Sequence, residues 1–450
     1  LADNAIVRVV DDLSYSLKIH SEENTTLVQK APHRFLLMSE VATLTLSVAF
    51  DFFDTPTQNI PFSLALKENR SHWVHFWETG AAISFNTTVT RAFELERRII
   101  LSLYLLAIQS LGSFPSAETG LTVNSWYGKF HLEMHPFHAL FAPFWGKGEL
   151  LKRSLWYYQS IRESAQKRAQ EQGYEGLRWP KMTEPNGSDA PSVIGCLLCW
   201  QQPHLILFAV ALKRSGFSIT EYLDLIEETI TFMISYLQDD GTRLNIGAPV
   251  IPAQENHDPV DVLNPTMEIE YWYWALGAGI TLVEEAGRGA PDEWKNARRR
   301  LALPPSKDGL YLAHEKCPDT YTKYATDHPS FLFSYGFIPG ERIDPAIMAA
   351  SLEKTKTSFN LTSMWGWDFP AMAMSATRLG NFDDALELLL LEAAKNTYRV
   401  NGHNAQGDRA DLPLYLPGNG AILLAVAMMV QHGAFPAQWG VEAEGFYPYL

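Results

Sequence analysis

The fold class is decided by residues 218–237, which read SITEYLDLIEETITFMISYL. Ser218-Ile219-Thr220-Glu221 has the form of a capping box, in which a hydroxyl and a carboxylate bind the first free N–H groups of a helix. The apolar residues that follow recur at helical spacing and share one face. They are Leu223, Ile226, Ile230, Met233 and Leu237. The stretch therefore predicts an amphipathic helix with one buried face.

The same spacing recurs over most of the chain. Further helices are predicted at 92–110, 130–143, 149–172, 190–213, 266–286, 291–302, 343–355, 368–379, 382–395 and 418–431. This makes about eleven or twelve helices, joined by long loops rich in Pro, Gly and Asn. Such a number fits six helical hairpins in a ring. We therefore expect a mainly α fold, an (α/α)6 toroid or six-hairpin barrel, over residues 86–450 as the catalytic domain.

The first 85 residues have a different pattern. Ala5–Val10, 35–46 and 60–66 are rich in β-branched and aromatic residues and are separated by Pro, Asn and Asp, which predicts strands. Residues 1–85 are thus expected to form a small β-rich N-terminal segment, part of a β-sandwich.

Charge and hydropathy narrow the choice of partners. The formal net charge is -15 and the chain has no basic block, which argues against nucleic acid or an anionic membrane as partner. The longest apolar runs, such as 421–430, are too short to span a bilayer. Five N-glycosylation sequons favour a secreted glycoprotein, at Asn24, Asn69, Asn86, Asn186 and Asn360. The pattern leaves the oligomeric state open.

Neither a metal nor a cofactor is predicted. Cys196, Cys199 and Cys317 do not form a disulfide framework, and the first two lie in a run expected to be helical. His131 and His135 are four residues apart, but they lack the HExxH order of zinc proteases and a third ligand.

The strongest candidate for chemistry is Pro252-Ala253-Gln254-Glu255-Asn256-His257, which precedes the aromatic run Tyr271-Trp272-Tyr273-Trp274. Apolar surroundings raise the pKa of a carboxyl group, so that it keeps a proton near neutral pH and can protonate a leaving glycosidic oxygen. We therefore predict Glu255 as a general acid. The alternative is a loop whose acid caps the next helix.

Several other loops combine Trp, His, amide and acid side chains next to predicted helices, among them 126–138, 178–187, 200–204, 365–368, 401–408 and 415–420. Aromatic faces stack on sugar rings and buried amides need partners such as sugar hydroxyls. The predicted substrate-binding residues are Glu133, Trp126, His131, Trp179, Lys181, Gln201, Gln202, His204, His257, Trp367, His403 and Gln406. A carbohydrate is the expected partner.

The order of these loops, from about Phe93 to Met429, resembles glycoside hydrolase family 65 and the wider six-hairpin glycosidases. Residues 252–257 are similar to the family's Gly-Pro-Asp-Glu-Tyr-His, which implies that Glu255 is the general acid. Residues 120–137 resemble the segment in which Glu133 falls on the acid that holds the terminal sugar. Residues 402–407 resemble Gly-Thr-Thr-Ala-Glu-Gly, whose glutamate is the catalytic base, but this chain has Gln406 there.

An inverting hydrolase needs a second carboxylate to activate water. Asp368, between two aromatic residues, is the first choice for this base, ahead of Asp408 and Asp411 in a polar loop. The chain is thus expected to be a secreted inverting glycoside hydrolase acting on oligosaccharides or polysaccharides.

Three alternatives stay open because of Gln406. A glycoside phosphorylase uses phosphate in place of water and needs no base. A polysaccharide lyase would draw its base and neutralising groups from His131, His135, Tyr127, Lys129 and Arg178. The third alternative is a toroid that binds carbohydrate without turnover.

Overall fold

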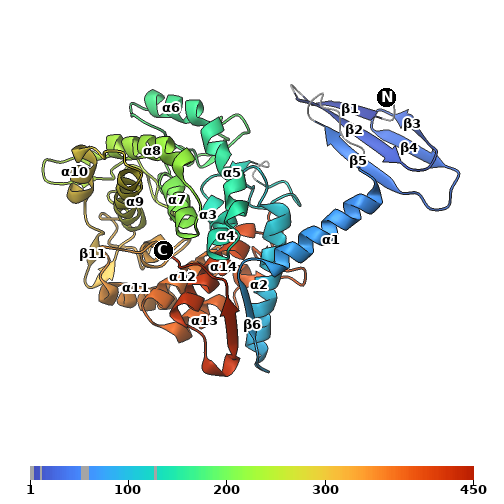
Figure 1. Cartoon of the computed structure of the whole chain (residues 1–450). Helices are drawn as coiled ribbons and strands as arrows, with labels where there is room; N and C mark the ends of the chain where they lie inside the picture. Colours follow the sequence, from blue (N-terminus) through green and yellow to red (C-terminus); the bar gives the residue numbers. More distant parts are fainter. Residues whose placement is uncertain (1–4, 11–12, 52–59, 126–128) are drawn as a thin grey trace. The chain divides into compact units, whose positions relative to one another are not determined.

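The computed structural model describes residues 5–10, 13–51, 60–125 and 129–450. The chain divides into two compact units, residues 1–79 and residues 80–450. Each unit is described by itself (Figure 1).

The first unit contains two small antiparallel sheets and one helix. One sheet has the order β1-β2-β5, and β3 and β4 form a hairpin. The bounds are β1 Ala5–Val10, β2 Leu13–Ser21, β3 Thr25–Ala31, β4 Arg34–Ser39, β5 Leu46–Asp51 and α1 Phe62–Glu78. The strand predicted at 60–66 is wrong, since these residues begin α1, whose Leu, Ala, Lys and Glu residues are strong helix formers. The strand predicted at 35–46 ends at Ser39 with β4, and β5 begins only at Leu46.

The second unit is mainly α. Its α-helices are α2 Thr90–Gln109, α3 His135–Ala139, α4 Phe141–Phe144, α5 Gly148–Ser160, α6 Arg162–Glu171, α7 His204–Arg214, α8 Leu223–Tyr236, α9 Thr266–Glu285, α10 Asp292–Arg300, α11 Pro345–Ser358, α12 Asp368–Arg378, α13 Phe382–Leu390 and α14 Leu416–His432. The 3-10 helices are η2 Thr220–Tyr222, η3 Ser330–Tyr335, η4 Ala394–Asn396 and η5 Ala437–Trp439. The strands are β6 Ala82–Phe85, β7 Phe130–His131, β8 Met182–Thr183, β9 Gln238–Asp239, β10 Leu244–Asn245, β11 Ser306–Lys307, β12 Leu310–Tyr311, β13 Thr397–Tyr398, β14 Asn404–Ala405 and β15 Val441–Glu444.

The helices differ in how much of their surface is buried. In α7, α9, α12 and α14 most residues are buried, whereas α5, α6, α10 and α13 bury one face. A helix that is apolar all round is covered on all sides, and an amphipathic one lies at the surface. The buried elements contact one another in the order α4, α7, α9, η3, α12 and α14, and α14 again contacts α4.

Glycine allows one of the closest approaches among these buried elements. A Cβ on Gly420 in α14 would overlap the carbonyl oxygen of Phe137 in α3. Only a residue without a side chain lets the two backbones meet there. At the edge of the unit, β6 pairs antiparallel with β15, which joins the first and last strands of residues 80–450. Within the described residues, no helix is both long and apolar enough to cross a membrane.

Several local predictions need correction. Residues 130–143 form β7, α3 and α4, and residues 149–172 form α5 and α6, where one helix each was expected. The helix predicted at 190–213 begins only at His204, because Pro191, Gly195 and Pro203 interrupt the earlier part, so Cys196 and Cys199 lie in turns. The capping box at Ser218 is not formed: its hydroxyl accepts the N–H of Thr220 at 3.4 Å, and a 3-10 turn precedes α8. Of the predicted buried face, Leu223, Ile226, Ile230 and Met233 are buried in α8, and Leu237, just beyond its end, is half-buried.

Candidate active site

Acidic, basic and aromatic side chains gather around one cavity of about 330 Å³. The volume lies at the lower end of the range for small-molecule sites. Its polar and aromatic lining consists of Glu118, Lys129, His131, Glu133, Lys181, Ser192, Glu255, His328, Trp365 and Tyr415.

These residues come from segments that lead into the buried helices. His131 and Glu133 precede α3, Glu255 lies in the loop before α9, and His328 precedes η3. Trp365 and Tyr415 lie just before α12 and α14. The N-terminal ends of several buried helices therefore meet at this cavity, and residues almost 300 positions apart become neighbours.

Lys181 joins two of the acids. Its Nζ lies 3.1 Å from Glu133 Oε2 and donates a hydrogen bond to Glu255 Oε1. The Trp200 indole N–H donates to Glu133 Oε1 at 2.7 Å, so both oxygens of the buried Glu133 carboxylate have partners. Burial lowers the pKa of Lys181, but the two carboxylates outweigh burial and raise it above its usual range. Lys181 is thus held as a cation between the two acids.

Glu255 has the properties required of a proton donor. Its side chain is 27% exposed and lines the cavity. Desolvation raises the pKa of the carboxyl group, Lys181 opposes the rise, and the charge of Glu133 adds to it, so that the pKa is about 7. A substantial fraction of Glu255 therefore keeps its proton near neutral pH.

His328 lies in the wall of the cavity with Asp368 behind it. His328 Nδ1 lies 2.7 Å from Asp368 Oδ1, and the Trp365 backbone N–H donates to Asp368 Oδ2 at 2.7 Å. Burial lowers the pKa of His328, but Asp368 and Asp327 outweigh burial and raise it to about 9. Asp368 is fully buried and is not among the residues that line the cavity. Its contacts favour a role in charging and orienting His328 over direct activation of water.

This arrangement predicts a change in the titration of His328 when Asp368 is replaced. Asp368→Asn keeps the shape of the side chain but removes the anion that raises the pKa of His328. We expect the midpoint to fall from about 9, because the charge of Asp368 is lost while burial, which lowers the pKa, stays and only Asp327 and Glu255 still oppose it. Two-dimensional ¹H–¹⁵N NMR of the imidazole nitrogens measures it. An unchanged midpoint would contradict the assignment of Asp368 as the partner of His328.

Glu118 is the third acid of the cavity. It is buried, lies 3.8 Å from His131 Nε2, and shares a hydrogen bond with the side chain of Tyr415. His131 Nδ1 lies 4.0 Å from Glu133 and accepts the Met134 N–H at 3.3 Å. Burial lowers the pKa of His131 well below its usual value, which makes it a neutral spacer between Glu118 and Glu133.

The structure brings only some of the predicted site residues together. Glu133, His131, Lys181 and Glu255 line the cavity. The other predicted residues among those described do not line it. They are Trp179, Gln201, Gln202, His204, His257, Trp367, His403, Gln406, Asp368 and Asp408. Trp126, like Tyr127 of the lyase set, lies outside the described residues.

Most of the residues outside the cavity have structural partners. The Trp179 indole donates to Thr229, and the Gln202 side chain bonds both the N–H and the carbonyl of Trp179. His204 lies between the Tyr271 hydroxyl and the Glu133 carbonyl. These buried polar side chains make their hydrogen bonds to backbone and hydroxyl groups in the core, as buried polar groups generally do.

The candidate bases Asp408 and Asp411 and the lyase residues also lie elsewhere. Asp408 and Asp411 are exposed, and Asp411 is paired with Arg409. His135 bonds Ser154 and Tyr158 in the core, and Arg178 bonds Gln172 and the Cys196 carbonyl. Of the residues named for a lyase, His131 and Lys129 line the cavity.

Sequence reasoning missed Glu118 and His328. Neither lies in a motif: Glu118 stands in Ser-Ala-Glu-Thr-Gly and His328 in Thr-Asp-His-Pro, which read as loops. Trp365 and Tyr415 belong to loops noted in the sequence, but the residue predicted in the first loop is Trp367, and none is predicted in the second. The backbone conformation just before α12 decides which of the two indoles, Trp365 or Trp367, reaches the cavity, and composition does not show it.

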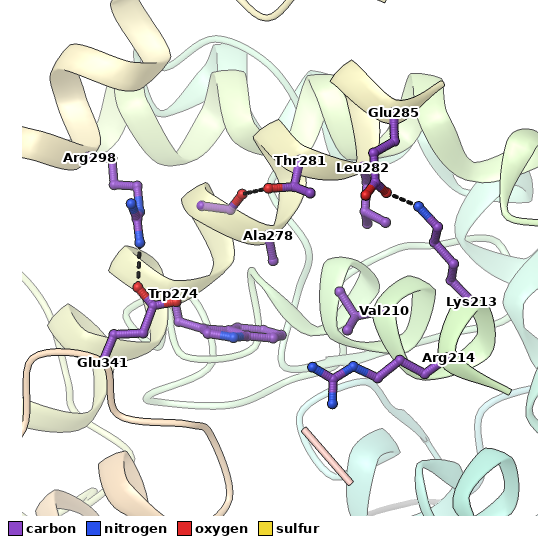
Figure 2. A pocket seen from close by; sticks show the side chains of 11 residues that line it. Val210, Lys213, Arg214, Trp274, Ala278, Thr281, Leu282, Glu285, Arg298 and Glu341 are labelled. Atoms are coloured by element: carbon purple, nitrogen blue, oxygen red, sulfur yellow. Dashed lines mark hydrogen bonds and ion pairs between the residues drawn. The ribbon is translucent and has the colours of Figure 1, made fainter. Parts of the chain in front are cut away.

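A second cavity differs from the first in the arrangement of its charged side chains (Figure 2). It has a volume of about 560 Å³ and lies between α7, α9 and the loop that carries Glu341. Its charged side chains are largely paired with one another, Lys213 with Glu285 and Arg298 with Glu341. Its lining holds two glutamates, Glu285 and Glu341, each bound to a cation, whereas three glutamates line the cavity around Glu255.

Comparison with solved structures places this geometry in a known fold. A protein described as "Putative kojibiose phosphorylase from human microbiome" has a TM-score of 0.68 and 12% identity, over 94% of this chain and 68% of that chain. The chain shares the fold of glycosidases. One glycosidase matches with a TM-score of 0.56 and 13% identity, over 77% of this chain and 99% of its own. A glycosidase variant in complex with glucose matches with a TM-score of 0.57 and 12% identity, again over 77% of this chain and 99% of its own.

These comparisons confirm the predicted resemblance to six-hairpin glycosidases at the level of the fold. No family model matches the chain, and no curated protein matches its sequence.

Proposed function

We propose that the chain is a secreted, inverting glycoside hydrolase that acts on an oligosaccharide or on the end of a polysaccharide. The observation that carries the proposal is Glu255, a cavity-lining carboxyl group with a pKa of about 7, held by Lys181 beside a second acid. A carboxyl group with this pKa keeps its proton up to near neutral pH and can then donate it to a substrate.

The proposed scaffold is an (α/α)6 toroid over residues 86–450. Its support is the alternation of buried and half-buried helices along the chain: α7, α9, α12 and α14 are buried, and α8, α10, α11 and α13 follow or precede them at the surface. The contacts of α4, α7, α9, η3, α12 and α14 return to α4. Six buried elements in a closed order are what a ring of six hairpins requires.

In the proposed first step, the Glu255 hydroxyl protonates the leaving glycosidic oxygen. Lys181 donates to the other oxygen of the same carboxyl group and stabilises the carboxylate that forms. Glu133 is bonded by Lys181 and Trp200, so we assign it to holding sugar hydroxyls. Trp365, half-buried in the wall, is assigned to contact with a sugar.

Glu118 is proposed as the base that activates water. Three glutamates line the cavity, and two of them, Glu133 and Glu255, share Lys181. A chain of contacts runs from Glu118 through His131 and Glu133 to Lys181, which also binds Glu255. Because the water lies between acid and base in an inverting enzyme, the proposal requires a gap of roughly 6.5–9.5 Å between the carboxyl groups of Glu255 and Glu118.

Exposure of the glycosylation sites supports the proposed secretion. All five sequon asparagines are exposed, at Asn24, Asn69, Asn86, Asn186 and Asn360. Mass spectrometry of the protein from a eukaryotic host, before and after glycosidase treatment, tests their occupancy.

The function is tested by product analysis. The purified protein is incubated with a panel of α- and β-linked oligosaccharides, with and without inorganic phosphate, and the products are followed by ¹H NMR from the first minutes. The proposal predicts a free sugar whose first-formed anomer is opposite to that of the substrate. A product of retained configuration, or no cleavage across the panel, would overturn it.

One observation favours glycoside phosphorolysis as a second candidate. His328, which is cationic below a pH of about 9, lines the cavity together with Lys129 and Lys181. Cationic side chains of this kind bind phosphate. In the assay above, a sugar 1-phosphate that appears only with added phosphate would replace hydrolysis by phosphorolysis, with Glu255 still as the acid.

The pH dependence follows from the pKa of Glu255. The acid must be protonated to act, so activity should fall as the pH rises through about 7. At low pH the base loses its charge, which gives an acid limb and an optimum of roughly pH 4.5 to 6.5. Values of kcat/KM measured from pH 3 to 10 check this. A rate that keeps climbing beyond pH 8 would contradict a carboxyl group as the acid.

A further inference from the structure

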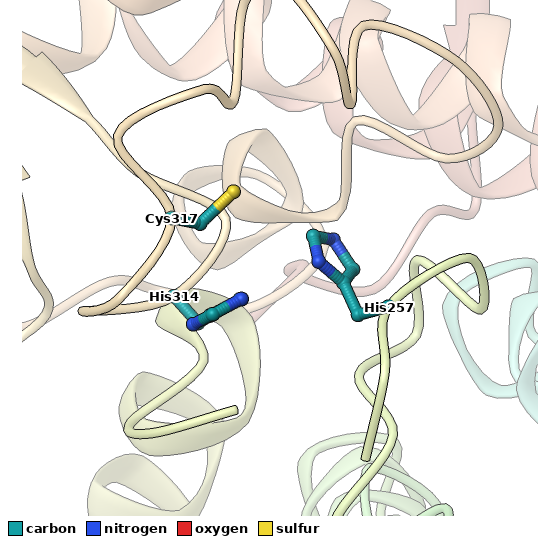
Figure 3. Close-up of side chains that lie close together, drawn as sticks. All are labelled: His257, His314 and Cys317. Carbon is teal, nitrogen blue, oxygen red and sulfur yellow. The ribbon is translucent and has the colours of Figure 1, made fainter. Parts of the chain in front are cut away.

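Three potential metal ligands that are far apart in the sequence meet outside the cavity. His257 lies in the loop before α9, and His314 and Cys317 lie in the loop between β12 and η3. One ligand atom from each lies within 4.8 Å of the other two, and all three side chains are buried. Figure 3 shows the Cys317 sulfur and both imidazole rings directed toward a common point.

The orientation of His257 leaves one nitrogen available. Its Nε2 lies 3.1 Å from Gln254 Oε1, while the Gln254 amide nitrogen donates to the carbonyls of Tyr324 and Thr326. These two bonds identify the amide oxygen, which can only accept, so His257 Nε2 carries the proton. Nδ1 then holds a lone pair.

That lone pair is buried without a hydrogen bond. His257 is 5% exposed, and Nδ1 has no partner within the part of the chain that the structure describes. Tyr324 stacks on the ring with centroids 4.3 Å apart, which holds its plane. A buried acceptor without a partner costs free energy. The bond from Nε2 to Gln254 is also the support that metal-binding histidines commonly have.

We propose that His257, His314 and Cys317 bind a single zinc ion, with a fourth position for water or another ligand. Two imidazoles and one thiolate suit zinc, whose protein sites combine such ligands in tetrahedral geometry. Bond lengths of about 2.0–2.3 Å place the ligand atoms of a tetrahedral site roughly 3.5 Å apart. The three ligand atoms therefore need to move only slightly closer together to bind the ion.

Binding has two costs that the structure defines. His314 Nδ1 accepts the Lys316 backbone N–H at 3.2 Å, so coordination through Nε2 moves the ring proton to Nδ1 and opens this long contact. The Cys317 thiol loses its proton to solvent, as thiolate ligands do. The charged groups that act on the two rings are Lys316, Lys323 and Asp261, of which only Asp261 favours a cation. We expect weaker binding than in all-cysteine structural sites.

The site would act on the loop that carries Glu255. His257 is two residues from Glu255, so a zinc ion would tie this loop to the segment of His314 and Cys317. Zinc binding itself does not depend on the proposed glycosidase function, because it is measured without a sugar substrate.

The experiment uses the full chain, purified, treated with chelator and reloaded with zinc chloride or cobalt chloride. We expect one zinc ion per chain by mass spectrometry of the metal content. The cobalt form should show a thiolate-to-metal charge-transfer band. Zinc should raise the midpoint of thermal unfolding by at least roughly 2 °C, since a ligand that binds the folded state stabilises it.

Variants separate this site from adventitious binding. Cys317→Ser and His257→Gln should each lose the bound ion and the thermal shift, and Cys317→Ser should lose the charge-transfer band. Cys199→Ser is the matched control, since Cys199 is also buried but lies outside the cluster, and it should keep all three. Circular dichroism confirms that each variant is folded, and His314→Gln replaces any that is not. No uptake, or uptake unchanged in the cluster variants, would overturn the proposal.

Discussion

Glu255→Gln is expected to lower kcat for oligosaccharides by about 10³-fold, within the range that a general acid contributes. The amide has nearly the same shape and can still accept from Lys181, but it has no proton to give. The loss should be much smaller for glycosyl fluorides, because fluoride leaves without being protonated. Steady-state kinetics on both substrate classes measures the difference.

Glu268→Gln is the matched control for this prediction. Glu268 is also buried, and burial raises the pKa of its carboxyl group to about 7, but it accepts the Ala253 N–H and does not line the cavity. Its replacement should change kcat by less than about tenfold. Equal losses in the two variants, or full activity of Glu255→Gln, would show that Glu255 is not the acid.

Glu118→Gln is expected to lower kcat by about 10²- to 10⁴-fold for oligosaccharides and glycosyl fluorides alike. A base is needed whichever group leaves, because the attacking water must lose a proton. Azide needs no deprotonation, so it should restore turnover and give a glycosyl azide of inverted configuration. Product analysis by NMR identifies this azide.

Asp368→Asn and Asp408→Asn complete this comparison. Asp408 is exposed in a loop, so its replacement should leave kcat within about twofold. Asp368→Asn should lower activity through the charge of His328, without rescue by azide. If azide rescues Asp368→Asn and Glu118→Gln is fully active, the base is Asp368, as the sequence predicted.

The mainly helical fold of the second unit could be predicted from local sequence. The apolar residues of α2, α8 and α9 recur at helical spacing, and these helices form close to their predicted bounds because one face, or the whole surface, must be buried. The prediction failed at 60–66, where a short apolar run fits either a strand or a helix. It also failed at 190–203, where Pro191, Gly195 and Pro203 interrupt the helix.

The position of Glu255 in the site could also be predicted from the sequence. A single acid among polar residues, followed by an aromatic helix, is a local pattern, and the structure places it in the cavity. Its neighbours Glu133, His131 and Lys181 lie in similarly marked segments. Trp179, Gln202 and Trp367 have the same composition but fill the core, because a buried indole or amide satisfies core groups as well as it would a sugar.

What only the tertiary structure decided is which distant groups meet. Glu118, His328 and Tyr415 share a cavity because several buried helices begin at the same end of the second unit. Asp368 lies behind His328 at the start of α12, and His257 meets Cys317 where two loops pack together. Periodicity records which face of a helix is buried, but the charge and pKa of a group depend on neighbours that packing brings from elsewhere in the chain.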